Sequence, residues 1–124
     1  MSIAVPMHPA AAEVAAAFHS EVVEEVAARV SDNDVVVVGM GWNPHVKRAC
    51  RLLTDANIPY LYHEIGNYSA RWRERLAVKL WSGWPTFPQV FVKGMLIGGA
   101  DQVQALLESG QLEELLQGGP ASEV

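Results

Sequence analysis

Apolar residues recur along this chain with two different periods, and these periods predict where its helices and strands lie. From Ala10 to Val30 an apolar residue stands at every fourth position, which aligns those side chains along one face of a helix. His19 and Ser20 are expected to interrupt this segment, so that Ser20 caps a second helix beginning at Glu21. The run Val35–Val38 is β-branched throughout and too short for a helix, so it predicts a central, buried strand.

The rest of the chain continues this alternation of helices and strands. We expect helices over Pro44–Ala56, Ser69–Trp81, Asp101–Ser109 and Gln111–Leu116, and strands over Tyr60–Ile65, Gln89–Val92 and Met95–Ile97. The first two strands flank a helix and should be parallel with a right-handed crossover, whereas Lys93-Gly94 predicts an antiparallel hairpin between the last two. This order predicts an α/β protein with the thioredoxin fold, in which a four-stranded mixed sheet carries helices on both faces.

Composition narrows the class of protein. The length of 124 residues predicts one domain, which we place at residues 21–117, after a helical extension at 1–20 and before a flexible tail at 118–124. The chain has no apolar run long enough to span a membrane and no basic segment typical of a secretory signal. A net charge of -5 argues against nucleic acid as a partner. The single cysteine cannot form an intramolecular disulfide and fits a cytoplasmic location.

Three segments in the second half of the chain form one pattern, which is specific because of their order and spacing. They are Trp84-Pro85-Thr86-Phe87-Pro88-Gln89-Val90-Phe91-Val92-Lys93-Gly94, Leu96-Ile97-Gly98-Gly99-Ala100-Asp101 and Glu108-Ser109-Gly110-Gln111-Leu112. Together they resemble a monothiol glutaredoxin of the Cys-Gly-Phe-Ser class, and the resemblance extends over roughly residues 21–116. In the first half, Asn43-Pro44-His45-Val46 follows the first strand, where such a protein carries its active-site motif. Asn43 then stands in place of the nucleophilic cysteine, and Val46 in place of the second one.

The resemblance implies a site for glutathione. Its residues would be Asn43, Arg75, Phe87, Pro88, Gly99, Ala100 and Asp101. Pro88 would be a cis-proline that holds the Phe87 backbone open to the cysteinyl part of glutathione, and Asp101 would receive the γ-glutamyl ammonium group. The N–H groups at the start of that helix would bind the γ-glutamyl carboxylate, and Gly98-Gly99 would allow the backbone to approach the ligand. Arg75 either contacts the glycyl carboxylate or belongs to a solvated helix face, and Met40 replaces a lysine that the family uses nearby.

Without a cysteine at position 43, the usual chemistry of this family is not expected. An asparagine side chain cannot exchange disulfides, and it is no ligand for an iron-sulfur cluster, which requires thiolates. Two interpretations of Asn43 stay open: it caps the following helix only, or its amide also contacts glutathione or a partner. Cys50, two helical turns further on, is either a small helix residue or a relocated nucleophile. We interpret His45 as an exposed loop residue, because none of the four histidines has zinc-like spacing.

These features predict a redox-inactive, glutaredoxin-like module that binds glutathione or a protein, without metal, membrane or nucleic acid. Trp84 is the tryptophan expected to line the groove. The main alternative is an electron-transfer or iron-sulfur cluster handling protein that uses a non-standard thiol, from Cys50, a partner or glutathione itself. A further alternative is an assembly role for the N-terminal extension, with a homodimer as one outcome.

Overall fold

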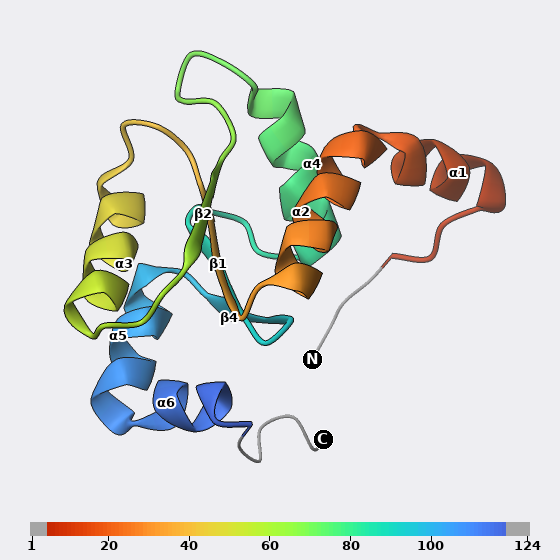
Figure 1. Ribbon diagram of the computed structural model, residues 1–124. Coiled ribbons are helices and arrows are strands. Elements are labelled where there is room, and N and C mark those ends of the chain that lie inside the picture. The colour runs from red at the N-terminus through yellow and green to blue at the C-terminus, as the bar shows by residue number, and fades with distance from the viewer. Residues whose placement is uncertain (1–4, 119–124) are drawn as a thin grey trace.

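The computed structural model describes residues 5–118 and has helices on both faces of one sheet (Figure 1). The predicted tail, residues 118–124, lies outside the described residues apart from Gly118. The helices are α1 Pro9–Ala17, α2 Ser20–Asp32, α3 Pro44–Asp55, α4 Trp72–Ser82, α5 Ala100–Ser109 and α6 Gln111–Leu116. The strands are β1 Val35–Gly39, β2 Leu61–Glu64, β3 Gln89–Val92 and β4 Met95–Gly98.

The sheet has the strand order β2-β1-β3-β4, which confirms the predicted mixed sheet. β1 pairs with β2 in parallel and with β3 antiparallel, and β3 forms the expected hairpin with β4. The side chains of β1 alternate between two apolar clusters, since successive residues of a strand point to opposite faces. Val36 and Val38 pack toward α2 and α4, whereas Val35 and Val37 pack toward α3, α5 and α6. All five residues of β1 are buried, as the unbroken valine run predicts.

The N-terminal segment breaks where the sequence indicates, but only its second half joins the core. His19 lies in the left-handed backbone region with φ 45°, and Ser20 is the first residue of α2 rather than its cap. α2 buries Val22, Val26 and Val30, whereas α1 buries no residue and extends away from the sheet (Figure 1). Val14, expected on the same apolar stripe, is 73% exposed, because the chain turns at His19 and the stripe is not continuous.

The helix expected from Ser69 begins only at Trp72, so this boundary was wrong by three residues. Asn67 and Ala70 form an isolated bridge, and the Asn67 Oδ1 atom accepts hydrogen bonds from both the N–H and the hydroxyl of Ser69. Arg71 then adopts a left-handed conformation with φ 65°. Local side-chain-to-backbone hydrogen bonds of this kind compete with helix formation, so the segment turns before the helix starts.

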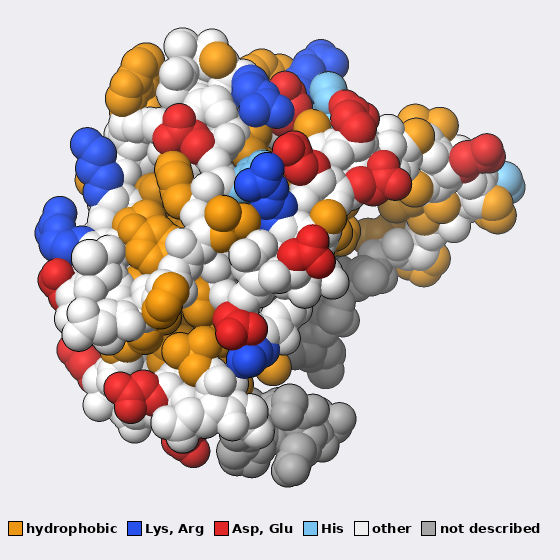
Figure 2. Space-filling model, in the orientation of Figure 1, with side chains coloured by type: hydrophobic (Ala, Val, Ile, Leu, Met, Phe, Trp, Pro, Cys, Tyr) orange, Lys and Arg blue, Asp and Glu red, His pale blue; other side chains and the backbone are white. Residues whose placement is uncertain are grey.

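Charge is distributed unevenly over the surface. Acidic side chains gather over α2, and basic side chains lie on the outer side of α3 (Figure 2). Within residues 5–118, none of the helices has the length and apolar character needed to cross a bilayer. The same residues contain no cluster of three or more His, Cys, Asp or Glu side chains arranged to hold a metal ion.

Candidate functional site

Three segments that are distant in sequence form one groove beside the start of α5. We call it the α3–α5 groove, and its volume is about 290 Å³. Its walls come from the first turns of α3, from the loop before β3 and from the start of α5. The lining residues are His45, Arg48, Trp84, Thr86, Phe87, Pro88, Gly99, Ala100, Asp101 and Gln102. This volume lies near the lower end of the range for small-molecule sites.

The loop before β3 forms the floor of the groove around a cis peptide bond between Phe87 and Pro88, the conformation that the resemblance implies. Phe87 is buried, and Trp84 lines the groove as expected. The side chain of Gln89 is fully buried behind this loop, and its Nε2 atom donates a hydrogen bond of 2.9 Å to the Trp84 carbonyl. A buried amide that binds the loop backbone stabilises this conformation, because breaking that bond would leave a polar group unpaired.

The start of α5 contributes backbone N–H groups to the groove. The first N–H groups of a helix have no carbonyl partner within that helix, and Ala100 and Asp101 stand at this position. The N–H of Gly99 is already used, since it donates a hydrogen bond of 2.9 Å to the Gln102 Oε1 atom. Gly98 has φ 120°, and a Cβ atom there would come within 2.7 Å of the Gln102 side chain, so this turn requires glycine.

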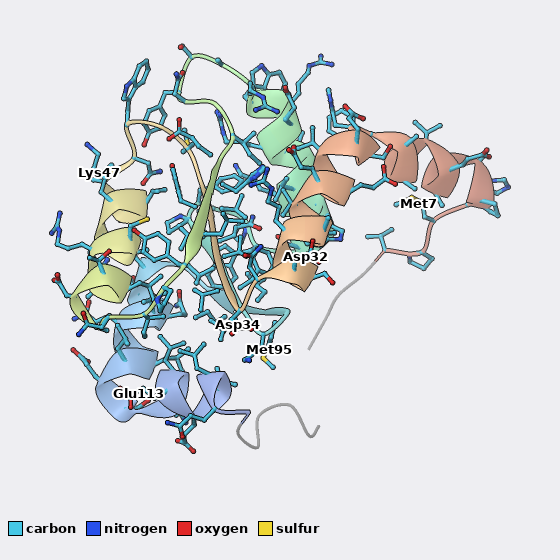
Figure 3. All side chains as sticks on the ribbon, in the orientation of Figure 1. Met7, Asp32, Asp34, Lys47, Met95 and Glu113 are labelled. Carbon is cyan, nitrogen blue, oxygen red and sulfur yellow. The ribbon has the colours of Figure 1, made fainter. Side chains whose placement is uncertain are left out.

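Arg48 extends across the groove from α3 to α5, and it was not among the predicted site residues. Its Nη2 atom donates hydrogen bonds of 2.7 Å both to Asp101 Oδ1 and to Gln104 Oε1. The side chain of Arg48 is 35% exposed and that of Asp101 81% exposed, so the ion pair is open to solvent. The neighbouring Lys47 points away from the sheet (Figure 3). His45 lies in the first turn of α3 rather than in a loop, one helical turn before Arg48, so the i, i+3 spacing was a signal for a shared face.

Asn43 caps α3 and does not line the α3–α5 groove. Its Oδ1 atom accepts hydrogen bonds from the N–H groups of His45 at 2.8 Å and Val46 at 3.1 Å. The residue is buried, with 8% of its surface exposed. It borders a separate cavity of about 340 Å³, which Cys50 and Tyr62 also line. These two hydrogen bonds therefore support the interpretation of Asn43 as the cap of α3.

Arg75 lies outside the groove as well. Its Nη1 atom donates hydrogen bonds to the carbonyls of Ile65 at 3.0 Å and Ala70 at 2.7 Å. Only 7% of the residue is exposed, and burial lowers the pKa of its guanidinium. The side chain thus connects α4 to the loop that follows β2. Both bonds use Nη1, so the guanidinium keeps the N–H donors of Nη2 and Nε beside this structural contact.

Cys50 is half-buried on α3 and packs against both apolar clusters of the core. Burial raises the pKa of the Cys50 thiol, and the Tyr60 hydroxyl opposes this effect in part. A raised pKa leaves less thiolate at neutral pH, and thiolate is the reactive form. The thiol does not line the α3–α5 groove.

Of the predicted site residues, the structure brings five together in the groove and leaves two outside. The five are Phe87, Pro88, Gly99, Ala100 and Asp101, and the two are Asn43 and Arg75. His45, Arg48, Thr86 and Gln102 join the groove without having been predicted there. The result is a cavity with a helix N-terminus and one internal ion pair, and with no sulfur atom on its walls.

Comparisons with known proteins agree with this geometry. A family model described as Glutaredoxin matches residues 35–97. A glutaredoxin-like protein of Dictyostelium discoideum is 44% identical over 95 residues, which cover 77% of this chain and 77% of that protein. Monothiol glutaredoxin-4 of Schizosaccharomyces pombe is 40% identical over 65 residues, which cover 52% of this chain but only 25% of that protein.

Solved structures share the fold over most of the chain. Reduced glutaredoxin C1 from Populus tremula x tremuloides superimposes with a TM-score of 0.73 at 27% identity, covering 84% of this chain and 89% of that one. Oxidized glutaredoxin 2 from Chlamydomonas reinhardtii gives a TM-score of 0.70 at 28% identity, covering 80% and 94% of the two chains. These likenesses agree with the strand order and the helix layers described above.

Proposed function

Because this chain belongs to the glutaredoxin family, we propose that it binds glutathione in the α3–α5 groove and acts there as a redox-inactive binding module. The observation that carries this proposal is the convergence of three segments on one cavity with no thiol on its walls. A groove that is built without a nucleophile can hold a tripeptide but cannot exchange disulfides with it.

Each wall of the groove has a part in the proposed binding. The N–H groups at the start of α5 take the γ-glutamyl carboxylate, since helix N-termini favour anions. The carboxylate of Asp101, which is 81% exposed, takes the γ-glutamyl ammonium group. The backbone of Phe87, next to the cis peptide bond, pairs with the cysteinyl part of the ligand.

The residues of the groove do not fit an iron-sulfur cluster. Such a cluster is held by thiolates, and Cys50 lines a different cavity, together with Asn43. Burial raises the pKa of the Cys50 thiol, which also disfavours electron transfer through this residue. The binding module is therefore the function that the chain's own side chains support best.

Calorimetric titration with reduced glutathione tests the proposal. We expect saturable binding by the wild-type chain and about tenfold weaker binding by Asp101→Ala, because a hydrogen bond to a charged group is lost. Asp55→Ala is the matched control: it removes the same charge from an exposed position at the end of α3. No binding at millimolar glutathione, or equal losses in both variants, would overturn the proposal.

An assay of glutathione-dependent disulfide reduction tests the redox-inactive part separately. We expect no turnover above the uncatalysed rate. Robust activity that persists in Cys50→Ser would contradict this part while leaving glutathione binding in place.

A further inference from the structure

Arg48 forms an ion pair with Asp101. In the proposed site, the carboxylate of Asp101 is the group that binds the ammonium of the ligand. Arg48 reaches over from α3, and Asp101 stands in the first turn of α5, 53 residues later. A second hydrogen bond to Gln104, also 2.7 Å long, holds the same Nη2 atom. In the free protein, Asp101 is therefore already neutralised by a cation from within the chain.

The ion pair between Arg48 and Asp101 affects which ligands the groove prefers. This inference rests on the proposed function. A γ-glutamyl end carries both an ammonium group and a carboxylate. Asp101 attracts the ammonium, but the guanidinium of Arg48, which is hydrogen-bonded to that carboxylate, repels it, so the two contributions oppose each other. The carboxylate of the same ligand is attracted both by Arg48 and by the N–H groups of α5.

We propose that Arg48 is the specificity-determining residue of this groove, and that it removes the advantage of a free ammonium group on the ligand. The groove then selects γ-glutamyl compounds, and related dicarboxylates, by their carboxylate. Compounds whose amine is blocked or missing bind as well as glutathione does. Because the pair is exposed to solvent, the effect of Arg48 is modest, about fivefold in affinity.

Two ligands that differ only in the ammonium group test this inference. They are reduced glutathione and glutaryl-cysteinylglycine, which lacks the α-amino group but keeps both carboxylates. Each is titrated calorimetrically at pH 6.5 and low salt into the wild-type chain, Arg48→Gln and Arg51→Gln. Arg51 is the matched control, since it is exposed on the same helix and makes no ion pair or side-chain hydrogen bond within residues 5–118.

We expect the wild-type chain and Arg51→Gln to bind the two ligands within about twofold of each other. Arg48→Gln should bind the analogue about fivefold more weakly than the wild-type chain does, because the attraction of Arg48 for its carboxylate is lost. Its affinity for glutathione should change little, because the lost attraction for the carboxylate and the lost repulsion of the ammonium offset each other, so that it prefers glutathione about fivefold. The ratio between two ligands on one protein is a readout that a merely structural role of Arg48 would not change.

The outcomes separate this inference from the function on which it rests. Suppose that the wild-type chain binds glutathione and that Asp101→Ala weakens this binding. If the wild-type chain then prefers glutathione to the analogue as strongly as Arg48→Gln does, the inference on Arg48 fails and glutathione binding stands. A loss of glutathione affinity in Arg48→Gln as large as its loss of affinity for the analogue would also overturn it, because Arg48 would then act on both ligands alike. If no variant binds either ligand, both the inference and the proposed function fail.

Discussion

At the scale of single residues, Asn43 combines two features that a helix start requires. Its side chain accepts two backbone hydrogen bonds from the first turn of α3, and Pro44 follows at a position where a missing N–H has no cost. A cysteine at this position would be a weaker cap, because sulfur is a weak hydrogen-bond acceptor. The residue that excludes thiol chemistry therefore also stabilises the helix.

Replacing Asn43 measures this contribution. Asn43→Ala should lower the free energy of unfolding by about 1 kcal/mol, whereas Asn43→Asp should keep most of the stability, because aspartate caps as well as asparagine does. Urea denaturation followed by circular dichroism gives both values. A loss in Asn43→Asp as large as that in Asn43→Ala would contradict the capping role.

The same two variants address the second interpretation of Asn43. If the amide only caps α3, glutathione affinity should be the same in Asn43→Asp as in the wild-type chain. A loss of affinity in Asn43→Asp without a loss of stability would instead indicate direct contact between the amide and the ligand.

At the scale of elements, Arg75 connects α4 to the loop that follows β2. Its guanidinium binds the carbonyls of Ile65 and Ala70, which lie just before and within the turn that delays the helix. Arg75 therefore has a structural role in this chain, beside the ligand contact that the resemblance implies. The start of α4 at Trp72 follows from this arrangement together with the local bonds of Asn67.

Arg75→Met should lower the free energy of unfolding by about 2 kcal/mol, because two carbonyls lose a charged, buried donor. Arg73→Met on the same helix is the control, since Arg73 is exposed and only stacks over Trp72, and it should change stability by less than about 0.5 kcal/mol. Chemical denaturation gives the difference. If Arg75→Met and Arg73→Met were equally stable and only Arg75→Met lost glutathione affinity, Arg75 would be a ligand-binding residue instead.

At the scale of the whole molecule, α1 is the element least attached to the rest. It buries no side chain, and Val14 on it and Leu80 on α4 are both largely exposed. A cavity of about 600 Å³ lies between α1, α2 and α4. The core formed by the sheet, α2 and the remaining helices does not depend on contacts with α1.

Removal of residues 1–17 should therefore change the free energy of unfolding by less than about 1 kcal/mol, because little apolar area is exposed by it. Light scattering on the full and shortened chains at the same concentration tests the assembly role that the sequence left open. A mass that halves on removal would show that α1 mediates self-association. A loss of several kcal/mol in the shortened monomer would contradict the prediction.

The sequence by itself determined the fold and most of the boundaries of its elements. The valine run of β1, the hairpin turn at Lys93-Gly94 and the proline and glycine positions around β3 and α5 act locally, so their consequences are readable from neighbouring residues. The five groove residues named by the resemblance lie in these same segments, and they line one groove.

Only the tertiary structure decided which charged groups meet. Arg48 and Asp101 are 53 residues apart, and no local pattern indicates that the guanidinium of one lies across the groove to the other. Arg75 stands where the resemblance implies a ligand contact, yet in the folded chain its guanidinium binds two backbone carbonyls. A long or polar side chain has several partners within reach, and the packing of helices on the sheet selects one of them. The affinity and selectivity of the groove therefore depend on contacts that form only when α3, α4 and α5 come together.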